Sequence, residues 1–211
     1  MGRLHIDLFV TLDGVAQAPG GPEEDTAGGF PFGGWQAPLW DDVVDRKVVA
    51  GIEQMDALLL GRRTYDIFAS YWPQQEQGED ATVALRLNAV PKYVASRGTP
   101  DLPWAGSTQL GPDLVAEVRA LKDRHESIHV IGSVDLCQTL LAERVFDVLT
   151  LWMYPVVLGQ GKKVFPDGAR ASGLTLLEPP VAGPSGAVML RYGPTGADPA
   201  TGDMTQPDRG V

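Results

Sequence analysis

The sequence predicts an α/β fold built on one central mixed sheet. Short apolar segments typical of strands alternate with amphipathic segments typical of helices, and two strand-like segments follow near the end. Alternating strands and helices favour parallel pairing, whereas consecutive strands pair antiparallel. Three predicted strands also end in turns that suit phosphate, at 60–61, 95–97 and 131–133. We therefore expect a mostly parallel sheet with antiparallel C-terminal strands, and a ligand beyond the strand carboxyl ends.

The composition is that of a globular protein without a nucleic-acid surface. The chain has 211 residues, enough for one domain, with 44% hydrophobic and 21% charged residues. A net charge of −10 argues against nucleic acid, because binding a phosphate backbone needs a basic face. One cysteine, Cys137, excludes a disulfide framework and predicts a reducing compartment. No apolar run approaches the ~20 residues of a membrane span and no signal-peptide pattern is present, so we expect a cytoplasmic location.

The first part of the chain predicts a strand, a long loop and a helix. Residues 4–10 alternate and then run apolar, as a strand does. Residues 18–34 hold glycine, proline and acids with little periodicity, which predicts a long loop that is functional or disordered. A helix is expected over 40–54, where Asp41 and Asp42 fall in the first turn and the helix dipole favours anions.

The middle of the chain contains the junction DALLLGRRTYD, at 56–66, where an apolar strand runs into Gly61, two arginines and Thr64. Backbone N–H groups at a helix start have no intrahelical partners, and the dipole makes that end positive. The junction therefore predicts a phosphate clamp; the alternative is a tight turn whose arginines are solvated. The elements expected here are strands at 57–60 and 92–96, helices at 64–70 and 81–89, a polar loop at 73–80 and a proline-rich connection at 98–106.

The last part begins with the clearest helix, 112–124, which has proline and acids early, basic residues late and one apolar face. After Pro194 the composition offers almost nothing to bury, so we expect one domain over 1–194 and a disordered tail over 195–211. The elements expected between them are strands at 127–132, 145–154, 174–178 and 187–192, a helix at 134–143 and a glycine-rich loop at 155–165.

Two glycine-rich segments resemble nucleotide motifs without matching them. The turn at Gly132 and Ser133 follows a strand and opens a helix, but it lacks the G-x-G-x-x-G pattern. Its N–H groups suit a phosphate; the alternative is an ordinary turn with a serine cap. The segment 159–162, GQGK, breaks the P-loop pattern, which excludes an ATPase of that type. The three histidines are scattered, so we expect no metal site.

The order and spacing of six segments resemble the dihydrofolate reductase-like superfamily. Within it, the chain resembles the C-terminal reductase domain of the bifunctional riboflavin-biosynthesis deaminase-reductases. The matching segments are FVTLDG (9–14), LLLGRRTYD (58–66), KYVASR (92–97), HVIGSVDLCQTLL (129–141), LWMYPVVLGQGKKVF (151–165) and VMLRYGP (188–194). The resemblance implies a three-layer αβα fold and an NADPH-dependent reductase; the riboflavin enzymes reduce a phosphorylated ribosylaminopyrimidine.

The resemblance also assigns the cofactor to the three phosphate turns found above. The helix start after the second strand would bind cofactor phosphates, the S-R strand end the adenosine 2′-phosphate, and the I-G-x turn the pyrophosphate. Several arginines suit the extra phosphate of NADPH. The residues concerned are Gly61, Arg62, Arg63, Thr64, Ser96, Arg97, Gly132, Ser133 and Val134.

The substrate side is predicted from carboxylates and an aromatic ring. Dihydrofolate reductases hold the pterin with a carboxylate on the first helix, and Asp41 or Asp42 falls near that position; the alternative is a solvated helix start. Thr11 and Asp13, at the end of the first strand, are further candidates to orient substrate or relay a proton. The alternative is a proton that comes from solvent through water. Trp40 is a candidate to stack on a flat heterocycle, with core packing as its alternative. Gly159 and Gly161 are expected to let backbone approach the substrate.

The sequence therefore predicts an NADPH-dependent reductase that transfers hydride to a small pterin- or pyrimidine-like heterocycle. Two alternatives stay open: a nucleotide-binding sensor or scaffold without catalysis, and a flavin-using enzyme on the same fold. The apolar segment 148–158 predicts a homodimer.

Overall fold

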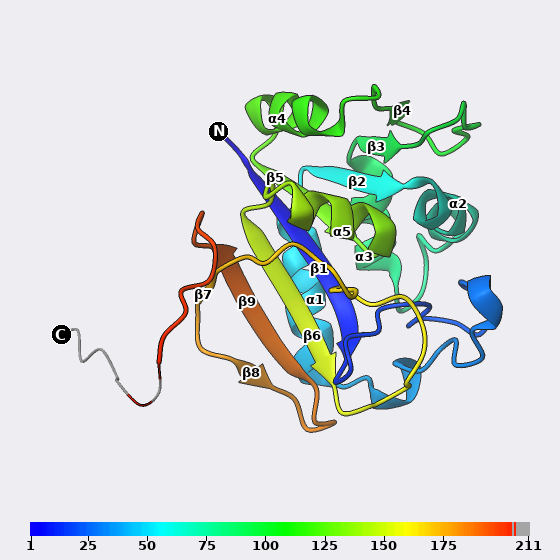
Figure 1. The fold of residues 1–211 in the computed structure, drawn as a ribbon. Helices are drawn as coiled ribbons and strands as arrows, with labels where there is room; N and C mark the ends of the chain where they lie inside the picture. Colours follow the sequence, from blue (N-terminus) through cyan, green and yellow to red (C-terminus); the bar gives the residue numbers. More distant parts are fainter. Residues whose placement is uncertain (204, 206–211) are drawn as a thin grey trace.

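The computed structural model describes residues 1–203 and 205, and within them nine strands form one sheet. The sheet order is β4-β3-β2-β5-β1-β6-β9-β7, with β8 paired to β9 (Figure 1). Pairing is parallel from β4 through β6 and antiparallel at β9 with β6, β7 and β8, which confirms the predicted mixed sheet. The strands are β1 (Arg3–Thr11), β2 (Ala57–Gly61), β3 (Lys92–Ala95), β4 (Ser107–Gln109), β5 (Ser127–Ile131), β6 (Val148–Tyr154), β7 (Leu174–Leu176), β8 (Val181–Ala182) and β9 (Val188–Pro194).

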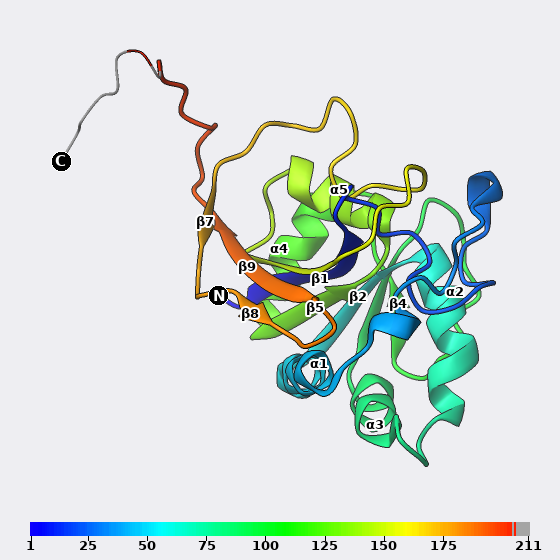
Figure 2. The same ribbon diagram turned by 90° about the horizontal axis from the view of Figure 1, so that it is seen from below.

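Helices cover both faces of the sheet, so the predicted three layers are confirmed (Figures 1 and 2). Helices α4 and α5 pack on one face, where Val118 and Leu140 meet the even-numbered side chains of β1. Helices α1, α2 and α3 lie on the other face, against aromatic residues of β6 and apolar residues of β2. The helices are α1 (Asp42–Gln54), α2 (Arg62–Tyr71), α3 (Ala81–Ala89), α4 (Leu114–Arg124) and α5 (Val134–Ala142), with single turns of 3-10 helix at η1 (Ala27–Gly29), η2 (Ala37–Leu39) and η3 (Trp72–Gln74).

The side chains of strand β1 point alternately to the two faces of the sheet. Leu4, Ile6 and Leu8 are almost fully buried against the α4 and α5 layer. Because successive side chains point to opposite faces, Asp7 and Phe9 face the α1 layer instead. A polar residue is thereby directed between the sheet and α1.

The boundaries differ from the expectations in a few places. Strands β4 and β8 were not predicted, because segments of three and two residues carry too little pattern. Helix α2 begins at Arg62, before the expected position 64. Helix α4 begins at Leu114 rather than 112, because the carboxylate of Asp113 accepts from the Ala116 N–H at 3.0 Å and caps the helix.

The segment 18–34 is folded onto the protein. Phe30 is buried in the apolar cluster that contains Tyr154, and the Trp35 indole N–H donates to the Gln17 carbonyl at 2.8 Å. This packing argues against disorder of the loop, and its functional role stays a prediction.

The predicted homodimer and the predicted disordered tail both stay predictions. Strand β6 is apolar because it lies inside the sheet between β1 and β9, so the homodimer predicted from it stays a prediction. In the predicted tail, the backbone N–H of Thr195 donates to the Gly173 carbonyl at 3.0 Å. Residues 204 and 206–211 of that tail lie outside the described residues, and the disorder predicted for the tail stays a prediction.

Candidate functional site

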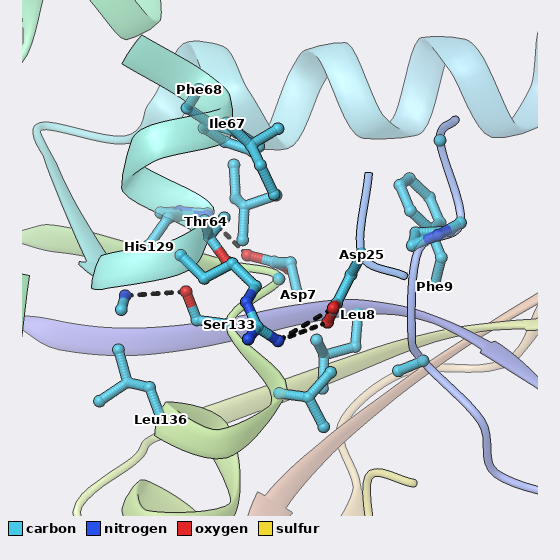
Figure 3. Close-up of a pocket in the computed structure, with 18 of the residues that line it drawn as sticks. Asp7, Leu8, Phe9, Asp25, Thr64, Ile67, Phe68, His129, Ser133 and Leu136 are labelled. Carbon is cyan, nitrogen blue, oxygen red and sulfur yellow. Dashed lines mark hydrogen bonds and ion pairs between the residues drawn. The ribbon is translucent and has the colours of Figure 1, made fainter. Parts of the chain in front are cut away.

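A large cavity opens at the carboxyl ends of β2, β3 and β5, between these strands, α1 and the loop at 18–34 (Figure 3). Its volume of about 1360 Å³ exceeds the ~300–1,000 Å³ typical of a site for one small ligand. Every residue predicted to bind the cofactor lines it: Gly61, Arg62, Arg63, Thr64, Ser96, Arg97, Gly132, Ser133 and Val134. The structure thus brings the three phosphate turns together around one space.

Two of these turns are joined directly. The backbone N–H of Gly61 donates to the Ser133 hydroxyl oxygen at 2.8 Å, linking the end of β2 to the start of α5. A Cβ on Gly61 would lie 3.2 Å from the Ser133 side chain, so the turns approach closely because this position is glycine. Ser133 precedes α5 with φ 60° and makes no side-chain cap, so the predicted serine cap is replaced by a contact with the neighbouring turn.

The arginines of α2 are held by carboxylates. Arg62 pairs with Asp66 at 2.7 Å, and Arg63 pairs with Asp25 of the long loop at 2.9 Å. Lys162 reaches the same Asp25 carboxylate at 2.8 Å. Burial opposes the charge of Asp25, but hydrogen bonds and the two cations lower the pKa of Asp25 below its usual value. The loop at 18–34 is therefore joined by ion pairs to both the start of α2 and the glycine-rich loop at 155–165.

The third turn, at Ser96 and Arg97, is supported by β4. The Gln109 side-chain amide donates to the Gly98 carbonyl at 2.6 Å. Arg97 is exposed, and no ion pair within the described residues involves it. A guanidinium in this position is available to a ligand phosphate.

Aromatic and apolar side chains form the opposite wall. Trp40 is 42% exposed and meets Phe9 edge to face, with ring centroids 6.0 Å apart. Both residues line the cavity, as do Val48 and Ile52 of α1. The place of Trp40 suits the predicted stacking on a flat ring.

The predicted acids make structural contacts instead of facing this cavity. Asp41 caps α1 by accepting from the Val43 and Val44 N–H groups at 2.9 Å, and accepts from the Ser185 hydroxyl at 2.6 Å. The Ser185 hydrogen bond, with the helix N–H groups, lowers the pKa of Asp41 to about 2. Asp42 is exposed on the first turn of α1. Neither residue is among the described residues that line the cavity, so their catalytic role stays a prediction without geometric support.

Asp13 and Thr11 also act on local structure. Asp13 accepts from the Thr11 hydroxyl at 2.6 Å and from the Gly159 N–H at 2.8 Å, and these bonds lower its pKa. Gly161 has φ 121°, and a Cβ there would lie 2.7 Å from Val15. These four residues are not in the described lining of the large cavity, and Gly161 instead borders a smaller one of about 290 Å³. The approach of backbone to substrate predicted for the two glycines also stays a prediction.

Other charged residues line the cavity that the sequence did not single out as candidates. Among them are Asp7 of β1, Asp25, Asp45 of α1 and Lys162, together with His129, which was interpreted as a core or surface residue. The signal for Asp7 was available, since it is an acidic residue between the apolar residues Ile6 and Leu8 of a strand that pairs on both edges.

A mixed sheet of this order, with a cavity at its strand ends, defines a dihydrofolate reductase-like α/β protein. The chain belongs to the RibD C-terminal domain family, whose model matches residues 3–179. The family supports a reductase role on this fold.

The chain is also similar to individual proteins. The chain is 27% identical to the uncharacterized protein YyaP of Bacillus subtilis over 192 residues, which covers 90% of this chain and 94% of that one. A structure from Shewanella sp. PV-4, provisionally assigned by name to riboflavin biosynthesis, has a TM-score of 0.69 at 17% identity, covering 92% and 99% of the two chains. Dihydrofolate reductase from Enterococcus faecalis, in complex with NADP(H), has a TM-score of 0.55 at 18% identity, covering 92% and 97%.

Two further properties concern only the part of the chain that the structure describes. None of its helices combines the length and apolar character needed to cross a membrane. No group of three or more histidine, cysteine, aspartate or glutamate residues in residues 1–203 and 205 is arranged to hold a metal ion.

Proposed function

We propose that this protein is an NADPH-dependent reductase that transfers hydride to a small pterin- or pyrimidine-like heterocycle. The observation that carries the proposal is the convergence of three strand-end turns on one cavity. Two helix starts, three hydroxyls and three guanidinium groups are the donors that phosphate groups bind. The volume of the cavity leaves room for a second, smaller molecule beside a dinucleotide.

The donor set fits NADPH in particular. Gly61, Thr64 and the Gly132–Val134 turn would hold the pyrophosphate at the starts of α2 and α5, while Ser96 and Arg97 would hold the 2′-phosphate. NADPH supplies the hydride when bound; the protein contributes binding and orientation. Trp40 and Phe9 would enclose a flat substrate ring and exclude water from it.

Calorimetry with NADPH and NADH tests the cofactor assignment. We expect NADPH to bind at least tenfold more tightly, because a guanidinium–phosphate pair contributes ~1.5–3 kcal/mol. Replacing Arg97 with alanine should weaken NADPH binding while leaving NADH binding nearly unchanged, because NADH lacks the 2′-phosphate. Replacing both Arg62 and Arg97 should weaken NADPH binding further and should also weaken NADH binding, because NADH carries the pyrophosphate. Asp66, the partner of Arg62, provides a control: Asp66→Asn frees Arg62 and should not weaken NADPH binding. Unchanged NADPH titration in the double variant would refute this assignment.

NADPH oxidation screened against pterins and pyrimidine nucleotides tests the reaction. Turnover of one of these compounds is the expected result. Tight NADPH binding without turnover of any of them would favour the nucleotide-binding module, and a yellow purified protein would favour a flavin enzyme.

A further inference from the structure

The α1-facing side of the sheet carries a row of polar side chains where apolar packing is the rule. Asp7 on β1, His129 on β5 and Thr150 on β6 lie on neighbouring strands, and Asp7 is the register partner of Thr150. Asp7 and His129 line the large cavity (Figure 3). The side chains of Asp7 and His129 take no part in the contacts described above for the phosphate turns.

The Asp7 carboxylate is fixed by His129. The His129 Nδ1 lies 2.8 Å from Asp7 Oδ2, and His129 Nε2 lies 3.2 Å from the Ser127 hydroxyl. The ring also stacks on His5, with centroids 4.6 Å apart and planes 1° from parallel. Both nitrogens of His129 are thus engaged within the protein, so His129 orients Asp7 and has no nitrogen left for a ligand.

The Asp7 side chain, in contrast, reaches the cavity. It is 23% exposed, while that of His129 is 7% exposed. Burial alone would raise the pKa of Asp7, but the hydrogen bond and charge of His129, with the Thr150 hydroxyl and His5, lower it below the ordinary value. An ionised carboxylate accepts hydrogen bonds and donates none. Asp7 therefore presents an acceptor to whatever ring lies in this part of the cavity.

Helix α1 forms part of the wall of the cavity that Asp7 lines. Val48, Gly51 and Ile52 of that helix line the same cavity, and a Cβ on Gly51 would meet nothing within 4 Å. Asp45, one turn after the start of α1, is a second carboxylate in the lining. A ligand in this space consequently meets acceptors on the sheet wall and on the helix wall.

We propose that Asp7, held in place by His129, is a specificity-determining residue that binds the N–H edge of the substrate. The substrate class that fits is a nitrogen heterocycle presenting adjacent N–H donors, such as an aminopyrimidine or amidine edge. An anionic or acceptor-only edge is disfavoured, because it would face an ionised carboxylate. This inference rests on the proposed function only in treating the bound ligand as the substrate of a reductase. The preference of the site for N–H donors does not depend on the cofactor.

Benzamidine is a suitable probe, because it presents two N–H donors on one edge and keeps its charge over the pH range used. Benzoate has a similar shape and offers only acceptors. Calorimetry with each probe, with and without saturating NADPH, should show benzamidine binding and at least a tenfold preference over benzoate. Asp7→Asn should reduce benzamidine affinity about tenfold or more, because the amide places a donor where the carboxylate accepted.

Asp45→Asn is the matched variant, since it makes the same change in the same cavity. Loss of benzamidine binding in Asp45→Asn with no loss in Asp7→Asn would overturn the proposal and assign the edge to the helix carboxylate. Asp123→Asn, on the exposed part of α4, controls for the change in net charge and should bind benzamidine as the wild type does. Absence of benzamidine binding to the wild type would also overturn the proposal. A failure of NADPH binding would instead refute the proposed function, because the benzamidine titrations stand without it.

The positioning role of His129 has its own readout. Benzamidine affinity of the wild type should fall only at low pH, as Asp7 is protonated. His129→Gln should move the midpoint of this fall to higher pH, because it removes the main group that stabilises the carboxylate; His5, Thr150 and the Cys137 thiol face it unchanged. Circular dichroism at each pH verifies that the variant is folded. An unchanged midpoint would show that His129 does not act through Asp7.

Discussion

The hydroxyl of Ser133 and the backbone N–H of Gly61, 72 positions apart in the chain, are joined at 2.8 Å. This bond fixes the two phosphate turns of β2 and β5 relative to each other. Its loss should affect stability and nucleotide binding together, which a bond elsewhere would not do.

Ser133→Ala should lower the free energy of unfolding by about 1 kcal/mol and weaken NADPH binding several-fold. Serine and alanine both carry a Cβ at this φ of 60°, so the substitution tests the loss of the hydroxyl alone. Urea unfolding and NADPH calorimetry measure the two effects. Ser133→Gly should recover part of the stability, since glycine accepts this backbone conformation, without restoring the affinity.

Asp41→Ala should lower the melting temperature by several degrees, because three N–H groups and the Ser185 hydroxyl lose their acceptor. The pKa of Asp41 is depressed to about 2, so its stabilising contribution is present above the unfolded pKa and is lost as pH falls through the folded one. Thermal unfolding at neutral and acid pH measures this. A variant that melts like the wild type but loses reductase turnover would instead support the catalytic role predicted for Asp41.

Gly161 and Gly159 provide a matched pair in the glycine-rich loop. Gly161→Ala should cost about 2–3 kcal/mol, because its Cβ would lie 2.7 Å from Val15 and 2.8 Å from Phe30 at φ 121°. Gly159→Ala should cost about 1 kcal/mol, since its Cβ meets open space at φ 75°. Chemical denaturation compares the two variants. Equal losses would contradict the steric role assigned to Gly161.

Lys92 is fully buried on β3, where its ammonium donates to the Asn88 and Ala105 carbonyls and lies 4.5 Å from the Trp104 ring centroid. Burial lowers the pKa of Lys92 to about 8. The unfolded chain then binds more protons above that pH, so stability should rise with pH between the folded and unfolded pKa values.

Lys92→Met removes this titration while filling a similar volume. From about pH 7.5 to about pH 9.5, the wild type should gain about 2 kcal/mol relative to the variant. Urea unfolding of both proteins at the two pH values gives this difference, in which other titrating groups cancel. A difference that shrinks or stays constant would show that Lys92 keeps its ordinary pKa.

Several parts of the fold followed from local pattern. The alternation in β1, the helix α1 and the strand-to-helix junction after Leu60 are short-range features, so residue type and spacing predicted them. The short strand β4 did not follow, because its pairing with β3 depends on the rest of the sheet.

The candidate site also contains features that local sequence predicted and features that only the folded chain shows. The phosphate turns combine glycines and hydroxyls at strand ends, a pattern visible in the chain. The sequence did not show that Asp41 and Asp42 lie outside the described lining of the cavity. Asp41 has the sequence context of a helix start, and only the folded chain shows that its carboxylate accepts a hydrogen bond from Ser185. Asp7 acquired a place in the cavity because its strand lies at the centre of the sheet.

The sequence by itself determined most of the strands and helices in their order along the chain, the three strand-end turns and the family, because each depends on neighbouring residues or on their spacing. Tertiary structure alone decided which carboxylates face the cavity and which hold the chain together. The pairing of Asp7 with His129, and of Asp25 with Arg63 and Lys162, joins residues far apart in sequence. Such contacts depend on sheet order and loop closure, which no local pattern encodes.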